Sequence, residues 1–273
     1  MSFTRINANI TALKSYNELL KINAKVGMHL LRLSSGKRIN TVGDDPAGFS
    51  LARGIESRRR SLSQALNNVS TAKNVLSIAE GSYLAIAEIL QVIKEKTVQA
   101  ADDAYNLDQK LAIQGQIDAL VSEIDDIVAE TEFQGTMLID GSFSAAKFQT
   151  GAGAGDVFEV SLNNVDATAL QIQALVVTDS STASTSMAAM DDAINTLNEA
   201  AQDVGEFTLR LDNKETTLAV SITNIESTRS RIEDADFAEE QMNLIRAQIV
   251  QQTAFASFAQ ANAAPQLVLS LFR

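Results

Sequence analysis

Apolar residues at alternating steps of three and four run through long parts of this sequence and restrict what it can fold into. Steps of this kind place side chains on one face of an α-helix, and a face of such length is typical of helices that wind around one another. The sequence therefore predicts long helices packed as a bundle. One such series is Leu62, Ala65, Val69, Ala72, Leu76, Ala79, Tyr83, Ile86, Leu90 and Ile93; a shorter one is Ile113, Ile117, Leu120, Ile124 and Ile127; and Met190, Leu197, Val204, Leu211, Leu218, Ile225 and Ile232 recur every seven residues.

Both ends of the chain are amphipathic as well. Residues 1–33 repeat large apolar side chains at helical spacing, and the segment from Phe237 carries two apolar stripes. A helix that is apolar on more than one face needs neighbours on more than one side. The cost of ordering 33 residues exceeds what burial of their apolar side chains returns, so the first segment orders only against several other helices. We expect the two ends to pair, and the pairs to assemble into an open helical filament.

A break separates the first helical segment from the long series, in the stretch LSSGKRINTVGDDPAGFSLA at residues 33–52. Asp45 before Pro46 is a typical helix start, because a carboxylate accepts free backbone N–H groups and proline suits the first helical position. We therefore interpret the pair Asp44 and Asp45 as caps rather than as metal ligands or an acid–base pair. A turn is expected around Asp102, Asp103 and Asn106.

The apolar period changes in the middle of the chain. Phe158, Val160 and Leu162 alternate with polar residues, which indicates a strand. The pair Asp140–Gly141 favours a hairpin turn. We predict a small β-hairpin region over residues 131–183, in which the run SSTASTS at 180–186 is a polar connection. The fold class is mainly α: a long coiled-coil-like helical bundle made from both chain ends, with this hairpin region between them.

Composition excludes several classes of function. The formal net charge of −12 argues against nucleic-acid binding, which needs a cationic surface. The chain has no cysteine, and one histidine, His29, for which we expect a packing or surface role. No nucleophile–base pair, cofactor motif or metal-ligand cluster stands out, so we expect no enzyme, no cofactor and no metal. We also expect no membrane span and, if the protein is exported, a route that does not use the general secretory signal.

The stretch at residues 33–52 resembles the N-terminal hallmark of bacterial flagellin, and further segments match that family in order: QVIKEKTVQAA, VSEIDDIVAETEFQGTMLIDG, RIEDADFAEEQ and ANAAPQLVLSLFR. The resemblance implies a secreted structural subunit that polymerises into the extracellular flagellar filament for swimming motility. It also implies an organisation: residues 1–33 and 235–273 form the inner filament core, 34–45 a connector, 46–130 and 184–234 a helical rod, and 131–183 the hairpin region. Because the middle is short, the chain looks like a minimal flagellin without large outer domains.

The resemblance implies partners too: other copies of the chain, the filament cap and hook-junction proteins, and a flagellar secretion chaperone (FliS-type). It implies that the subunit is exported unfolded through the flagellar type III apparatus, and that the chaperone wraps its C-terminal segment beforehand. The candidate residues for filament-core packing or chaperone binding are Ile6, Ile10, Leu13, Leu30, Leu33, Phe237, Met242, Leu244, Ile245, Ile249, Phe255, Phe258, Leu267 and Leu271.

Toll-like innate receptors recognise many flagellins on the first long helix. Glu95, Gln99 and Ile113 fit the recognised pattern; Val92 replaces an arginine, Lys96 a leucine and Gln116 a glutamate. The loss of a charged contact and the placement of a charge in an apolar one both weaken binding. We expect weak or absent receptor activation.

Two alternatives remain beside the filament subunit. A hook–filament junction protein shares the terminal heptads, but generally diverges from the LSSG…DDPAG and LSLFR segments present here. A helical export-apparatus tip protein or a coiled-coil chaperone would explain the heptads but not the matched motifs at both ends. Growth into filaments would separate these classes.

Overall fold

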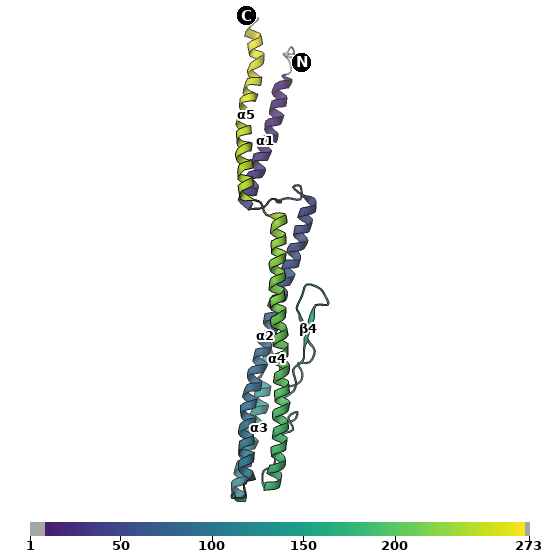
Figure 1. The fold of residues 1–273 in the computed structure, drawn as a ribbon, viewed down its shortest axis with the longest axis vertical. Coiled ribbons are helices and arrows are strands. Elements are labelled where there is room, and N and C mark those ends of the chain that lie inside the picture. The colour runs from purple at the N-terminus through teal and green to yellow at the C-terminus, as the bar shows by residue number, and fades with distance from the viewer. Residues whose placement is uncertain (1–8, 271–273) are drawn as a thin grey trace. The chain divides into compact units, whose positions relative to one another are not determined.

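The computed structural model describes residues 9–270, and the side chains of residues 9–263. The chain divides into two compact units, one from Met1–Ser57 with Asn224–Arg273 and the other from Arg58–Thr223. The elements in chain order (Figure 1) are α1 (Ile10–Ser35), α2 (Pro46–Ala101), α3 (Leu107–Glu130), β1 (Glu132–Phe133), β2 (Thr136–Met137), β3 (Ala146–Gln149), β4 (Val157–Val160), α4 (Ser180–Glu233) and α5 (Phe237–Ser270). The predicted fold class, mainly α with a small β region in the middle, is confirmed.

The core of the second unit contains the predicted apolar series of residues 62–93 on α2, which we call the seam. All ten positions from Leu62 to Ile93 are buried, and so are the heptad positions from Met190 to Leu218. Ile225 and Ile232, at the end of the heptad series, are half-buried. Ion pairs beside the seam join α2 to α4: Lys73 Nζ lies 2.7 Å from Asp212 Oδ1, and Lys94 pairs with Asp191.

Helix α3 packs through a stripe that differs slightly from the predicted one. Ile113, Ile117 and Ile124 are buried as predicted, whereas Leu120 and Ile127 are half-buried and their neighbours Val121 and Val128 are buried instead. The helix begins with a capping box, in which the Asn106 side chain accepts from Gln109 N and the Gln109 side chain accepts from Asn106 N. This box ends the predicted turn at residues 102–106.

The middle region contains two antiparallel hairpins rather than one. Phe158, Val160 and Leu162 are buried on one face, as the alternation predicted. The first hairpin turns at Gln134–Gly135, where both residues have positive φ (51° and 79°), and not at Asp140–Gly141, which lies in the loop between β2 and β3. Asp140 Oδ1 accepts from Ser142 N at 2.8 Å, so this aspartate stabilises a local loop turn.

The expected polar connection at residues 180–186 is wrong, because this run is the first part of α4. Asp179 Oδ1 accepts from the backbone N–H groups of Ser181 and Thr182, which caps the helix one residue before the serine run. Ala183 is fully buried, and Ser186 Oγ donates to Val176 O at 2.9 Å. Serine and threonine compete with helix formation only when their hydroxyls take backbone bonds elsewhere, and here the cap and the packing outweigh that tendency.

Helix α2 also bears on the expectation of no membrane span. By length and composition, this helix contains an 18-residue window that is apolar enough to cross a bilayer, with a mean hydropathy of 1.4. The expectation of no membrane span did not foresee such a window. A third of the window is buried inside the chain. A helix of a packed bundle meets the same criterion, so the composition agrees with the buried seam on this helix.

Candidate assembly surface

Helices α1 and α5 lie side by side and antiparallel in the first unit, so the predicted pairing of the two ends is confirmed (Figure 1). Polar contacts tie the pair along its length: Asn9 Nδ2 donates to Ala261 O at 2.8 Å, and Gln251 Nε2 donates to Asn23 Oδ1 at 2.6 Å. Asn9 also caps α1 by accepting from Ala12 N. These contacts define the register of the two helices.

A cluster of three charged or titratable side chains sits between the two helices. Glu240 is 7% exposed and bonds His29 Nδ1 through Oε2 at 2.5 Å and Arg32 Nη1 through Oε1 at 3.0 Å. Burial alone would raise the pKa of the Glu240 carboxyl, but the bonds from His29 and Arg32 outweigh it, and the pKa lies below its ordinary value of 4.5. His29 thus has the satisfied packing role expected for it, and the cluster cross-links α1 to α5.

Most of the apolar side chains that the sequence assigned to the filament core are uncovered in the single chain. Among the members whose side chains the structure describes, only Leu244 is buried, and Leu33 and Phe258 are half-buried. The exposed members are Ile10, Leu13, Leu30, Phe237, Met242, Ile245, Ile249 and Phe255, each between 48% and 64% exposed. Ile6 and Leu271 lie outside the described residues, as does the side chain of Leu267.

The break at residues 34–45 is a structured connection. Gly36 ends α1 in the left-handed region at φ 71°, and its carbonyl accepts from Ala235 N at 2.9 Å. Arg38 N donates to Glu233 O at 2.7 Å, which completes an antiparallel bridge between Lys37 and Asp234. We call residues 36–39 together with residues 232–235 the joint.

Side chains of the first unit add charge contacts to the joint. The Glu233 carboxylate bonds Lys37 Nζ at 2.7 Å through Oε1 and Arg229 Nη1 at 2.9 Å through Oε2. Burial alone would raise the pKa of Glu233, but Lys37 and Arg229 outweigh it and the pKa is lowered. The pKa of Arg229 is raised, chiefly by its bonds to Glu226. Sequence reasoning missed this cluster, as it missed Glu240; the only available signal was a charged residue within an apolar helical stripe.

The capping role predicted for the aspartate pair is confirmed for Asp45, whereas Asp44 binds N–H groups of preceding residues instead of those of α2. Asp45 Oδ1 accepts from Gly48 N at 2.9 Å at the start of α2. Asp44 Oδ2 accepts from Asn40 N and Thr41 N, and these bonds lower the pKa of Asp44. Gly48 fits tightly here, since a Cβ would lie 2.7 Å from Ile39 Cδ1.

The residues of the innate-receptor pattern are unequally accessible. Val92, Glu95 and Gln116 are exposed, and Lys96 and Gln99 are half-buried. Gln99 Nε2 donates to Tyr105 Oη at 3.1 Å. Ile113 belongs to the core of the second unit and is only 6% exposed.

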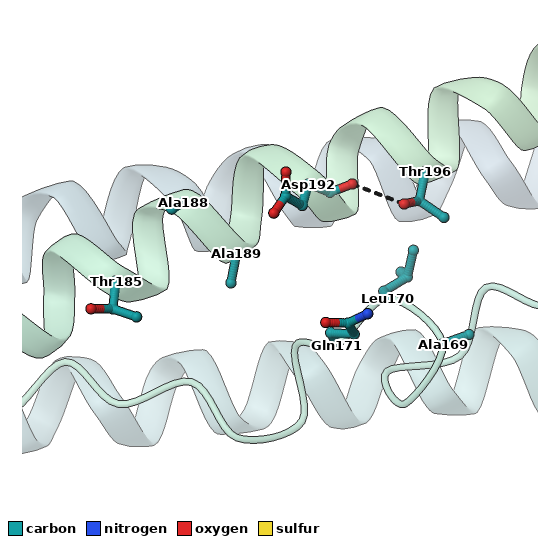
Figure 2. A pocket seen from close by; sticks show the side chains of 8 residues that line it. All are labelled: Ala169, Leu170, Gln171, Thr185, Ala188, Ala189, Asp192 and Thr196. Carbon is teal, nitrogen blue, oxygen red and sulfur yellow. Dashed lines mark hydrogen bonds between the residues drawn. The ribbon is translucent and has the colours of Figure 1, made fainter.

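A cavity of about 280 Å³ lies in the second unit between α4 and the loop at residues 169–171 (Figure 2). Its polar lining is sparse: Thr196 Oγ1 donates to Asp192 O, and Gln171 reaches in from the loop. No base stands beside a nucleophile among the lining residues, which are Ala169, Leu170, Gln171, Thr185, Ala188, Ala189, Asp192 and Thr196. Within residues 9–270, no group of three His, Asp or Glu side chains could hold a metal ion. The cavity has no arrangement for catalysis.

Charge is divided unequally between the units. Residues 58–223 contain 24 acidic and 10 basic side chains, a formal charge of −14, and the remaining residues contain 10 acidic and 12 basic side chains, a charge of +2. All the acidic side chains of the second unit except Asp166 and Glu215 are exposed. The uncovered apolar faces of α1 and α5 thus belong to the nearly neutral unit.

Comparison with known proteins places both halves of the chain in one family. The model of the bacterial flagellin N-terminal helical region matches residues 6–144, and that of the C-terminal helical region matches residues 187–272. A flagellin of Halalkalibacterium halodurans is 32% identical over 271 residues, which cover 98% of this chain and 99% of the relative. The flagellin of Bacillus subtilis is 33% identical over 306 residues, which cover 98% of this chain and all of the relative (100%).

Solved structures share the fold. A crystal structure of Bacillus cereus flagellin aligns with 56% of this chain and 88% of its own, at a TM-score of 0.50 and 24% identity. A putative flagellar hook-associated protein from Vibrio parahaemolyticus aligns with 70% of this chain and 100% of its own, at a TM-score of 0.58 and 15% identity.

Proposed function

The chain belongs to the bacterial flagellin family and is a structural subunit of the flagellar filament, not an enzyme, and we propose that its copies assemble through the exposed faces of α1 and α5. The observation that carries this proposal is the row of eight large apolar side chains that the paired helices leave uncovered. Large apolar side chains exposed together on one pair of helices mark a surface that a partner covers. The partner that the family supplies is another copy, and the filament that the copies build lies outside the cell.

Removal of the C-terminal segment tests whether copies assemble through α1 and α5. Concentrated full-length protein, seeded with filament fragments, is expected to grow into long filaments visible by negative-stain electron microscopy. A chain lacking residues 235–273 is expected to remain monomeric while it retains the helical seam of the second unit, checked by thermal melting of its circular dichroism. Polymerisation of the truncated chain would refute the assignment of assembly to the paired ends.

The division of the chain follows from the same proposal. Residues 1–33 and 235–273 form the filament core, 34–45 connect it to a rod made of 46–130 and 184–234, and 131–183 form the hairpin region. The joint supports the connector assignment, because Gly36 ends one helix and Pro46 begins the next with an ordered segment between them. Proteolysis of assembled filaments should spare the core segments longest.

Before assembly, the same exposed apolar residues of α5 serve as the binding surface for an export chaperone. The subunit passes unfolded through the flagellar type III apparatus and is secreted by that route, and a secretion chaperone (FliS-type) covers Phe237, Met242, Ile245, Ile249 and Phe255 until then. These side chains would otherwise promote aggregation. Co-purification of the chaperone with the full-length chain, and its loss with the 235–273 truncation, is the expected result. The filament cap and hook-junction proteins would meet the same surfaces at the two ends of a filament.

Receptor activation is proposed to be weak. Val92 offers no charge where the recognised pattern has an arginine, and Ile113 is buried in this fold. A receptor reporter assay should show little signalling at concentrations at which strong flagellin agonists saturate. Potent signalling would contradict this assignment.

A further inference from the structure

All the sulfur in this chain is methionine sulfur, because the sequence contains six methionines and no cysteine. The chain therefore has no thiolate, the sulfur group that oxidants attack most readily. Among the methionines in the part of the chain that the structure describes, Met242 alone is exposed, at 59%. Met190 is fully buried, and the half-buried ones are Met28, Met137 and Met187. Met242 is thus the methionine most open to an oxidant in solution.

Met242 lies on the face of α5 that is assigned above to contacts between copies. Ile245 and Ile249 follow it at intervals of three and seven residues, which places the three side chains on one side of the helix. Leu244, which is only 6% exposed, marks the side that the pairing with α1 covers. The exposure of Met242 does not require this pairing, because the pair leaves the face open and an unpaired segment would expose it as well.

Hydrogen peroxide converts a methionine side chain into its sulfoxide. The sulfur lone pair attacks one peroxide oxygen, so that an S–O bond forms as the O–O bond breaks. The second oxygen takes the proton of the first and leaves as water, and the sulfur loses the two electrons that the peroxide gains. The new oxygen accepts hydrogen bonds, but the neighbouring side chains Ile245 and Ile249 have no donor to offer. Burial of a polar group without a hydrogen-bond partner opposes association.

We propose that Met242 is a modification site at which hydrogen peroxide stops assembly. The sulfoxide forms on the free subunit, and the oxidised subunit no longer adds to a filament. Copies already in a filament cover this side chain, so the same sulfur is shielded there. The proposal rests on assembly through α1 and α5. Its consequence is that an oxidant limits growth and leaves existing filaments intact.

Oxidation rates test the shielding of Met242. Free subunits and filaments grown from seeds receive the same dose of hydrogen peroxide, catalase ends the reaction, and peptide mass spectrometry measures the sulfoxide at each methionine. Met242 should be oxidised at least about tenfold more slowly in filaments than in free subunits. Met190 is 0% exposed in the second unit, so it should react slowly in both states and serves as the internal reference. Equal rates at Met242 in the two states would overturn the proposal.

Critical concentrations test the effect of the sulfoxide on assembly. Oxidised subunits, cleared of peroxide, are added to untreated seeds, and the unpolymerised protein is measured after sedimentation. Oxidation should raise the critical concentration of the parent at least about tenfold. Met242→Leu has no sulfur at this position and should keep the rise below about threefold, whereas Met28→Leu, the matched control on α1, should still show about tenfold. Each variant is compared with its own untreated sample, so any effect of the substitution itself on assembly cancels.

Reduction separates the sulfoxide at Met242 from irreversible damage to the subunit. Methionine sulfoxide reductases that act on both sulfoxide epimers should return the critical concentration of the oxidised parent to within about threefold of its untreated value. An oxidised parent that polymerises normally would overturn the proposal, and so would equal losses in the parent and Met242→Leu. A subunit that stays defective after its Met242 has been reduced would overturn it too. Failure of the untreated parent to polymerise from seeds would instead contradict the proposed function.

Discussion

The most direct prediction concerns three exposed apolar residues on α5. Met242, Ile245 and Ile249 are 59%, 48% and 59% exposed in the single chain. Full burial of such a side chain is worth roughly 1.5 to 3 kcal/mol, and about half of each remains to be covered, so each should contribute about 1 kcal/mol to assembly. The triple alanine variant should therefore lose about 3 kcal/mol, which corresponds to a critical concentration about a hundredfold higher.

The assay is sedimentation of seeded filaments over a range of protein concentrations, with the unpolymerised protein measured in the supernatant. The matched comparison is Leu244→Ala, on the same helix but only 6% exposed. Because Leu244 packs within the α1–α5 pair, its loss should also reduce hydrogen-exchange protection of that pair, at a cost of about 2 to 5 kcal/mol. The triple variant should leave the exchange and thermal melting of the unassembled chain unchanged. An unaltered critical concentration in the triple variant would refute the assignment of these side chains to the contact between copies.

Three further results are expected. The pKa values of Glu233 and Glu240 lie below that of an unfolded glutamate, so both carboxylates stabilise the folded chain fully above about pH 4.5, and this stabilisation is lost as the pH falls through the lowered values. Acid titration of filament turbidity should show the loss, and Glu240→Gln should reduce its pH dependence. Leu211 is fully buried in the core of the second unit, and Leu211→Ala should destabilise that unit by about 2 to 5 kcal/mol, measured by urea unfolding; a change under about 1 kcal/mol would contradict the packing described. Amides of residues 1–33 in the isolated subunit should exchange much faster than those of the seam at residues 62–93, because only Ala12 and Leu19 of α1 are buried; protection as strong as that of the seam would contradict the free-energy argument for ordering on assembly.

Much of the fold was predictable because the seam is a repeat. Steps of three and four identify the buried face of a helix directly, and every position from Leu62 to Ile93 lies where the spacing placed it. The start of α4 was not predictable in this way. A run of serine and threonine favours loops by local propensity, and only the cap from Asp179 and the burial of Ala183, which depend on the folded chain, make it helical.

The candidate site was predictable in part for a related reason. Apolar periodicity marked the faces of α1 and α5, and Leu244 differs from its exposed neighbour Ile245 only in the direction it faces around the helix. Which of two apolar stripes the partner helix covers depends on the pairing itself. Glu233 and Glu240 were missed because a single carboxylate in a helix is usually solvated, and its partners lie on segments about two hundred residues away in the chain.

The division of charge between the units has a consequence for a growing polymer. Each added copy brings a formal net charge of −12, of which the second unit carries −14, beside the copies already in place, while the nearly neutral unit supplies the attraction. Mobile cations must gather along the filament to offset this mutual repulsion, and their screening range shrinks from about 30 Å in 0.01 M salt to about 8 Å in 0.15 M. Elongation in dilute buffer should therefore be slow, and the filament should behave in solution as a strong polyanion.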